Sequence, residues 1–209
     1  KNCGSRIIVN GQETADILNP TEAQHMGIRV VHQETPLIGS FTVSECVTLF
    51  KGYPKNKVGG IAWKVAKRYV DELLETFHLN ISPNMLAKDL TASQRNMLAM
   101  AIAIGKEDEI SKVTALILDE ADASVPEAEA ELFLKHVRSI ADMNIPVVMV
   151  THRLKAVRQF CDDVTILNGG KVVYDGLMKD TEDTFMISKM SPQQNAAGPG
   201  AQAQEKSEV

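Results

Sequence analysis

Residues 115–120, Ala-Leu-Ile-Leu-Asp-Glu, constrain the fold more than any other stretch of the chain. Four apolar residues in a row indicate a buried strand, and the strands of parallel sheets carry such continuous apolar runs. The run ends on two carboxylates, Asp119 and Glu120. Because ligands bind beyond the carboxyl ends of the strands in open α/β sheets, we expect both acids at a ligand site. The simpler alternative is that they cap a following helix, whose N-terminus favours acids.

The two acids are expected to have different roles. Adjacent residues of a strand point in opposite directions, so Asp119 and Glu120 cannot both do the same work. One carboxylate can hold Mg²⁺ while the other faces a water molecule beside a phosphate.

Two more apolar runs end on polar side chains. Residues 28–34, Ile-Arg-Val-Val-His-Gln-Glu, form a predicted strand that ends near Gln33, and residues 146–150 form another that is followed by Thr151 and His152. The amide of Gln33 and the imidazole of His152 are candidate site groups. The alternatives are a glutamine that faces solvent and an ordinary loop histidine.

Residues 90–95, Leu-Thr-Ala-Ser-Gln-Arg, open a segment that is apolar on almost every side as far as Ile104. This pattern predicts a buried helix with hydroxyl groups at its start. The backbone N–H groups of a helix N-terminus bind phosphate, and Thr91 or Ser93 can add a hydroxyl donor. The alternative is that both residues are plain helix caps.

In this order, the motifs resemble those of the nucleotide-binding domains of ABC transporters. The correspondence covers residues 5–176 and places five family motifs: the Q-loop at Gln33, the signature at 90–95, Walker B at 115–120, the D-loop at 122–125 and the switch histidine at 151–152. The stretches DEADASVPEAEAELF and VMVTHRLKAV are similar to the carbohydrate-importer branch of that family.

The resemblance implies an α/β fold of the P-loop NTPase class, with a parallel core sheet, antiparallel strands and a helical subdomain. It also implies ATP and Mg²⁺ as cofactors. Asp119 and Gln33 would hold Mg²⁺, Glu120 would orient the attacking water, and His152 would contact the γ-phosphate. The remaining nucleotide contacts would come from the signature and the D-loop, at Thr91, Ala92, Ser93, Gln94 and Asp122.

By resemblance, two such domains close around two ATP molecules to power import of a sugar. The implied partners are a second ATP-binding domain, identical or not, transmembrane permease subunits and, indirectly, a solute-binding protein. The implied location is the cytoplasmic face of the membrane, as a peripheral subunit. An alternative is an incomplete subunit that supplies only a signature surface to a competent partner. A DNA-repair or chromosome ATPase is a third hypothesis, disfavoured by the sugar-type sequence and the lack of a long coiled coil.

The sequence departs from the family in two places. No G-x-x-x-x-G-K-[ST] motif occurs, so the loop that cradles the β and γ phosphates is missing. We expect that the chain is a fragment that begins downstream of this loop and folds poorly alone, because the missing strand would lie next to residues 115–118. Ala92 and Ser93 replace two glycines of the signature, where side chains are expected to crowd the partner's phosphate. Ala121 and Pro126 also depart from the usual residues.

Composition excludes little. A net charge of −5 gives no electrostatic case for nucleic acid. Three cysteines, Cys3, Cys46 and Cys161, have neither metal spacing nor a disulfide framework, which fits a reducing compartment. No apolar run approaches the length of a membrane span.

We expect one ATPase domain at 1–190, with a helical subdomain at about 41–105, and a disordered tail at 191–209, which is rich in Pro, Gln and Ala. The other predicted elements are hairpins around 10–11 and 168–170, an amphipathic helix at 61–79 with Ile61, Val65, Tyr69, Leu73 and Phe77 in the core, a solvated loop at 105–112, and a helix from Pro126 to Met143 with solvated glutamates at 127, 129 and 131.

Overall fold

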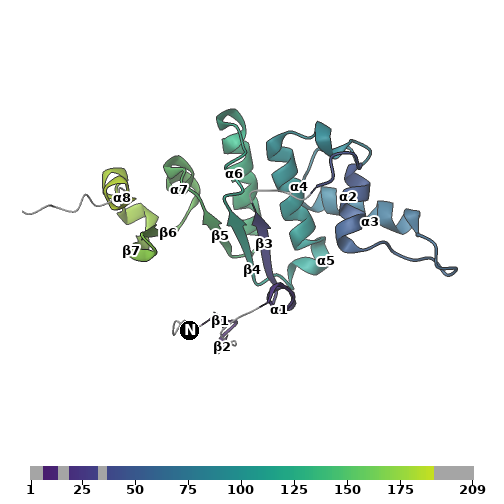
Figure 1. The fold of residues 1–209 in the computed structure, drawn as a ribbon, viewed down its shortest axis with the longest axis horizontal. Coiled ribbons are helices and arrows are strands. Elements are labelled where there is room, and N and C mark those ends of the chain that lie inside the picture. Colours follow the sequence, from purple (N-terminus) through teal and green to yellow (C-terminus); the bar gives the residue numbers. More distant parts are fainter. Residues whose placement is uncertain (1–6, 14–18, 33–36, 191–209) are drawn as a thin grey trace, which may run out of the picture. The chain divides into compact units, whose positions relative to one another are not determined.

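The computed structural model describes residues 7–13, 19–32 and 37–190 (Figure 1). The chain divides into two compact units, residues 1–156 and 157–209. Gln33, Cys3 and the predicted tail at 191–209 lie outside the described residues. The division into an ATPase domain, a helical subdomain and a tail therefore stays a prediction.

The first unit contains strands and helices in mixed order. They are β1 (Ile8–Val9), β2 (Gln12–Glu13), α1 (Pro20–His25), β3 (Ile28–His32), α2 (Val43–Lys51), α3 (Trp63–Thr76), the 3₁₀ turn η1 (Ala87–Asp89), α4 (Ala92–Ile104), α5 (Glu107–Ile110), β4 (Ala115–Asp119), α6 (Glu127–Asp142) and β5 (Val147–Val150). Helix α7 (Leu154–Phe160) crosses the boundary between the units.

The core of the first unit is a parallel sheet in the order β3-β4-β5, which confirms the predicted α/β class. Helix α4 packs against β3 and α6 packs against β5 (Figure 1). Leu116 and Leu118 of β4 are fully buried. The prediction that a further strand would lie next to residues 115–118 is wrong, because β3 and β5 occupy both edges of β4.

The sheet face opposite to the one that carries Leu116 and Leu118 is only partly covered. Val30 of β3 is 42% exposed, and Val148 and Val150 of β5 are 54% and 48% exposed. Val30, Ile117 and Val148 pair across the three strands, so they share one face. Parallel sheets are normally covered by helices on both faces, which makes this apolar face unusual for a parallel sheet.

Helix α3 is amphipathic, as predicted, but its buried face is rotated from the predicted one. The buried residues of the helix are Ala66, Val70, Leu73 and Leu74. Leu73 and Phe77 of the predicted stripe are in the core, whereas Ile61 is 38% exposed and Val65 is 49% exposed. The predicted stripe takes every fourth residue. Because a helix has 3.6 residues per turn, residues at this spacing move gradually around the helix and do not all stay on the buried face.

The segment predicted as a solvated loop at 105–112 contains helix α5 and an anchoring carboxylate. Glu109 accepts hydrogen bonds from the Tyr69 hydroxyl (2.8 Å) and from Lys51 Nζ (3.2 Å). These contacts tie the segment to α3 and α2. Burial, followed by the hydrogen bond to Glu109, raises the pKa of the Tyr69 hydroxyl.

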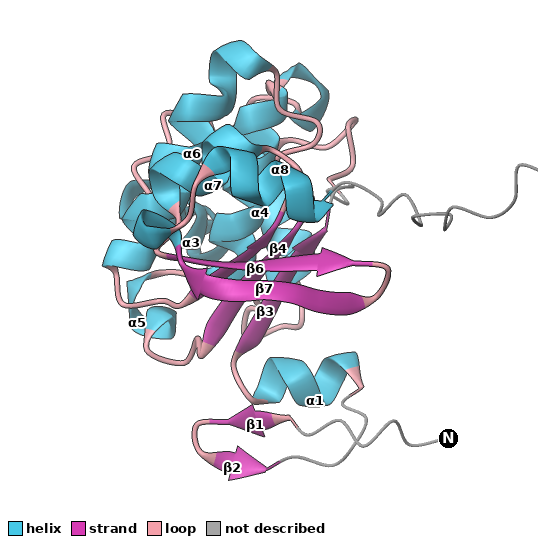
Figure 2. Ribbon diagram, turned by 90° about the vertical axis from the view of Figure 1, so that its left-hand side faces the viewer, coloured by secondary structure: helices cyan, strands magenta, loops and turns pink. Residues whose placement is uncertain are grey.

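The second unit is built on an antiparallel hairpin of β6 (Asp163–Asn168) and β7 (Lys171–Leu177) (Figure 2). The 3₁₀ turn η2 (Met178–Asp180) and helix α8 (Asp183–Met190) follow, and α8 packs on β6. Both predicted hairpins are therefore confirmed, since β1 and β2 also pair antiparallel. Across the described ranges, none of the helices combines the length and apolar character that crossing a bilayer requires.

Gly27 gives a first test of this fold. It precedes β3 with a φ of +84°, and a Cβ there would lie 2.4 Å from the carbonyl oxygen of Lys112 and 2.8 Å from the backbone nitrogen of Thr114. Gly52 has nearly the same φ, +83°, but a Cβ there would meet no atom within 4 Å. We expect Gly27→Ala to lower the free energy of unfolding by about 1 to 3 kcal/mol more than Gly52→Ala, because backbone must move. Urea denaturation measures both, and equal losses would contradict the steric argument.

His136 predicts a pH dependence of stability. Burial, followed by repulsion from His78, lowers the pKa of this histidine on α6. The unfolded chain then binds a proton at a higher pH than the folded chain, so stability is full above about pH 6.5 and falls as the pH drops below that value. We expect His136→Gln to reduce this acid-side loss in urea denaturation at about pH 7.5 and about pH 5.5, on either side of the ordinary histidine pKa. The exposed His25→Gln is the matched control, and an unchanged slope for His136→Gln would contradict the assignment.

Candidate functional site

The carboxyl ends of the three parallel strands form the centre of the candidate site. Strand register pairs Asp119 with His32 on one side and with Val150 on the other. His32 Nδ1 lies 3.5 Å from Asp119 Oδ2, and the two side chains are 70% and 53% exposed. Sequence reasoning did not single out His32, although it is the last residue of its strand, as Asp119 is of β4.

Glu120 occupies a strained position directly after β4. Its φ is +49°, in the left-handed region of backbone conformation that residues other than glycine rarely adopt. Its N–H donates a 3.0 Å hydrogen bond to the carbonyl of Val150, which ties the turn after β4 to the end of β5. The carboxylate is exposed. Strained residues of this kind concentrate at functional sites.

The turn after Glu120 is held from helix α4. The side-chain amide of Asn96, which is only 2% exposed, donates to the carbonyl of Ala121 and, at 3.3 Å, to the hydroxyl of Ser124. Because Asn96 lies in the helix that the signature opens, the turn and the signature helix are parts of one packed unit.

Asp122 and His152 meet at the same edge but face different surroundings. The Asp122 side chain is 2% exposed and accepts a 2.6 Å hydrogen bond from the Thr151 hydroxyl. His152, the next residue, is exposed. Contact between Asp122 and a nucleotide, which the sequence predicts, would require the carboxylate to leave its buried position.

The signature residues form the N-terminus of α4, and Thr91 is its cap. The Thr91 hydroxyl accepts from the N–H of Gln94 (3.2 Å), and the Gln94 side-chain oxygen accepts from the N–H of Thr91 (3.0 Å). Ser93 is 2% exposed, and its hydroxyl lies 4.0 Å from the sulfur of Met97. The side chain of Ser93 therefore turns into the core, and the expectation that it crowds a partner's phosphate stays a prediction.

The side chain of Glu129, a residue of α6, binds the N-terminus of α4. One of its oxygens accepts hydrogen bonds from the Thr91 hydroxyl (2.9 Å) and from the N–H of Ser93 (3.3 Å). The prediction of a solvated glutamate at this position is wrong for Glu129. The reason is that α4 and α6 pack together, which brings a carboxylate to the positive end of the α4 dipole.

Asp119 suits one role in magnesium binding. Mg²⁺ in nucleotide sites takes one or two carboxylates together with phosphate oxygens and water, and Asp119 is an exposed carboxylate at a strand end. Within the described part of the chain, no group of three or more His, Cys, Asp or Glu side chains is arranged to hold a metal ion by itself. The proposed second ligand, Gln33, lies outside the described residues.

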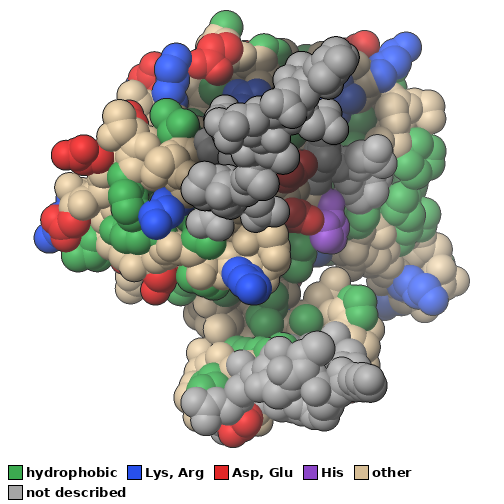
Figure 3. Space-filling model, turned by 60° about the vertical axis from the view of Figure 1, so that its left-hand side comes forward, with side chains coloured by type: hydrophobic (Ala, Val, Ile, Leu, Met, Phe, Trp, Pro, Cys, Tyr) green, Lys and Arg blue, Asp and Glu red, His purple; other side chains and the backbone are tan. Residues whose placement is uncertain are grey.

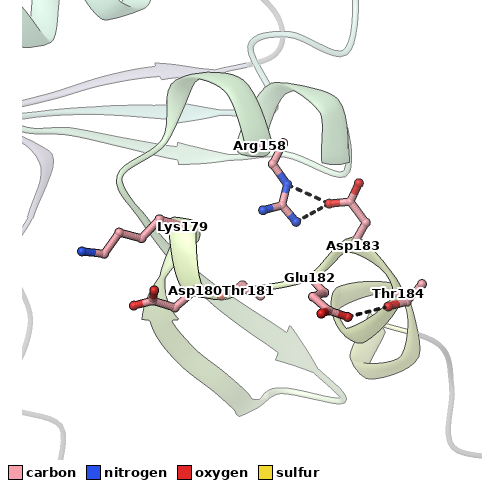
Figure 4. Close-up of a pocket in the computed structure, with 7 residues that line it drawn as sticks. All are labelled: Arg158, Lys179, Asp180, Thr181, Glu182, Asp183 and Thr184. Carbon is pink, nitrogen blue, oxygen red and sulfur yellow. Dashed lines mark hydrogen bonds and ion pairs between the residues drawn. The ribbon is translucent and has the colours of Figure 1, made fainter.

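The charge pattern adds little to the site. On the face drawn in Figure 3, a histidine lies beside acidic side chains, and the lysine and arginine side chains in view are scattered. The second unit has an open hollow of its own, in which Arg158 binds Asp183 through Nε (2.8 Å) and Nη2 (Figure 4). This hollow contains none of the predicted site residues.

Relatives of the chain are found by sequence. It is 30% identical over 183 residues to the ribose import ATP-binding protein RbsA of Clostridium tetani, an alignment that covers 86% of this chain and 34% of the relative. It is 28% identical over 185 residues to ribose import ATP-binding protein RbsA 3 of Rhizobium etli, covering 88% and 35%. The chain thus spans about a third of the length of these relatives. No protein-family model matches it.

Solved structures with the same fold are ATP-binding cassettes. A nucleotide-free cassette from an ABC transporter superposes with a TM-score of 0.66 at 18% identity, covering 90% of this chain and 74% of that one. The cassette MJ0796, in a dimeric post-hydrolysis state with ADP and phosphate, gives 0.60 at 19% identity, covering 83% and 73%.

The chain has the fold of ABC ATPase domains, which belongs to the P-loop NTPase class. Over most of its length it resembles the ATP-binding proteins of ribose import, as the carbohydrate-importer resemblance predicts.

A substitution of Glu129 tests how much its contact with the N-terminus of α4 stabilises the fold. We expect Glu129→Gln to lower the free energy of unfolding by about 1 to 2 kcal/mol, because a charged acceptor at the N-terminus of α4 becomes neutral. Glu131→Gln, on the same helix in an exposed pair with Lys135, is the matched control, and it should lower the free energy of unfolding clearly less than Glu129→Gln does, because water and salt screen a surface pair. Urea denaturation compares them, and equal losses would show that Glu129 contributes no more than a surface acid.

Proposed function

We propose that this chain is the core of an ATP-binding and ATP-hydrolysing subunit that powers an ABC importer, with a sugar as the transported class. The main support is the convergence of Asp119, Glu120 and the 151–152 loop at the carboxyl ends of the parallel strands. The similarity to ribose import proteins supports the sugar class.

Asp119, with Gln33, is proposed to hold Mg²⁺. The metal, when bound, neutralises charge on the phosphate oxygens. His32, at 3.5 Å from Asp119, is placed to bias the orientation of that carboxylate. Asp119 is half exposed, so it can reach a ligand without rearrangement of the core.

Glu120 is proposed to orient and deprotonate the attacking water. Its backbone is fixed by the bond to Val150, and its carboxylate is exposed on the same edge as His152. His152 is proposed to contact the γ-phosphate with its imidazole. A base and a phosphate contact on two adjoining loops are what in-line attack by water requires.

The phosphate cradle and the partner subunits of the transporter are proposed to lie outside this chain. The β and γ phosphates need a cradle of backbone N–H groups, which the sequence does not supply. A second ATP-binding domain, permease subunits and, indirectly, a solute-binding protein are the proposed partners. The proposed location is the cytoplasmic face of the membrane, as a peripheral subunit.

Glu129 bears on the alternative that the chain supplies only a signature surface. An incoming phosphate at α4 would have to displace Glu129 from Thr91 and Ser93, or share these donors with a carboxylate of the same charge. A subunit whose sole task was to present this surface would gain from free donors. Catalysis on the chain's own Glu120 is therefore the favoured function, with Thr91, Ala92 and Gln94 in an auxiliary role.

Glu120→Gln in the full-length protein tests the proposal. We expect ATP binding to persist and turnover to fall by about 10² to 10⁴-fold, because the amide keeps the shape but cannot take a proton. ATP should then accumulate in a stable dimer, which gel filtration with labelled nucleotide detects. Glu13→Gln on the exposed strand β2 is the matched control. Hydrolysis by Glu120→Gln at the parent rate would remove Glu120 from the mechanism.

A further inference from the structure

A buried charge cluster lies directly beneath the proposed site. Asp122 Oδ2 accepts a hydrogen bond from the Thr151 hydroxyl at 2.6 Å and lies 3.8 Å from Arg153 Nε. The Thr151 hydroxyl oxygen also accepts a 3.0 Å bond from the N–H of Arg153. We call Asp122, Thr151 and Arg153 the Asp122 clamp. It joins the turn after β4 to the loop after β5.

Arg153 extends the clamp along the turn. Its Nη2 donates a 2.7 Å hydrogen bond to the carbonyl of Val125, and its Nη1 lies 3.8 Å from a carboxylate oxygen of Glu127. The Arg153 side chain is 23% exposed, so it is largely withdrawn from solvent. One side chain therefore holds the turn from Asp122 to the first residue of α6.

The clamp buries a carboxylate, which is unfavourable and which a link that served only stability could avoid. Asp122 is 2% exposed, and its second oxygen, Oδ1, has no hydrogen-bond partner among the described residues. Burial of a carboxylate with one unsatisfied oxygen is unfavourable, and apolar residues often replace buried ion pairs without loss of stability. A buried charge in this position calls for a role other than stability.

The clamp is attached to both proposed catalytic residues. Glu120 lies two residues before Asp122, in the strained turn, and His152 lies between Thr151 and Arg153. Each end of the His152 backbone is thus tied to the turn that carries Glu120. Within this arrangement, a shift of the clamp changes the separation of the two exposed side chains.

We propose that Asp122 and Arg153 are positioning residues, which fix Glu120 and His152 relative to each other while remaining out of contact with the nucleotide. This inference rests on the proposed function, since it assigns the residues that orient that site. It differs from the nucleotide contact that the sequence alone predicts for Asp122, because the carboxylate points into the protein.

The test uses the full-length protein with Asp122→Asn, which removes the charge but keeps the shape. We expect kcat to fall about ten-fold or more, since misplacement by about 1 Å costs up to about 10²-fold, while KM for ATP changes by less than about two-fold. Thr151→Val should reproduce this effect, and Thr151→Ser, which restores the hydroxyl, should return most of the lost kcat. Asp142→Asn, which breaks an exposed pair with Arg138 on α6, is the matched control.

Hydrogen exchange without nucleotide separates this inference from the proposed function. We expect Asp122→Asn to speed amide exchange in residues 120–126 and 151–154 together, and Asp142→Asn to leave both segments unchanged. If the parent protein fails to hydrolyse ATP, the proposed function is wrong, and the exchange result still tests the clamp. If the parent hydrolyses ATP and Asp122→Asn matches its kcat, or exchange rises in only one segment, the clamp does not position the site.

Discussion

The pairing of β4 with β3 on one edge and β5 on the other is the constraint on which the site depends. This register sets Asp119 beside His32 and Val150, and it brings the residue after each strand to one edge of the sheet. The bond from Glu120 N–H to Val150 continues the pairing one residue beyond the strand. A slip of one residue would turn Asp119 to the other face, so the hydrophobic contacts of Leu116 and Leu118 also fix the position of the acids.

The same sheet is covered unequally. Helices α4 and α6 pack on the face that buries Leu116 and Leu118, whereas Val30, Val148 and Val150 remain half exposed. An apolar parallel face of this kind requires a covering layer. The outer edge of β5 is also unpaired among the described strands. An unpaired strand edge exposes backbone N–H and C=O groups that can pair with a further strand.

Local pattern predicted much of this structure, and tertiary contact decided the rest. Apolar runs predicted β3, β4 and β5, and Asn-Gly turns predicted both hairpins, because these signals depend on a few neighbouring residues. The order of strands in the sheet is a long-range property, which is why the missing strand was assigned to the wrong neighbour. The sequence predicts solvated side chains for Glu109 and Glu129, and this is wrong. Their hydrogen-bond partners, Tyr69 and Thr91, lie about 40 residues away in the chain, so local pattern does not reveal them.

Two acids, Glu129 and Asp122, link the elements around the candidate site, and the sequence alone indicates neither link. Glu129 places a negative charge at the N-terminus of α4, which satisfies donors there and makes any external anion compete with it. Asp122 places another beneath the turn of Glu120, held by Thr151 and Arg153. Because both carboxylates bridge elements, each couples the position of a surface loop to packing in the core. Asp119 and Glu120 stay exposed at the strand ends, with His32 3.5 Å from Asp119, whereas Asp122 and Glu129 are held by contacts that join the elements around them.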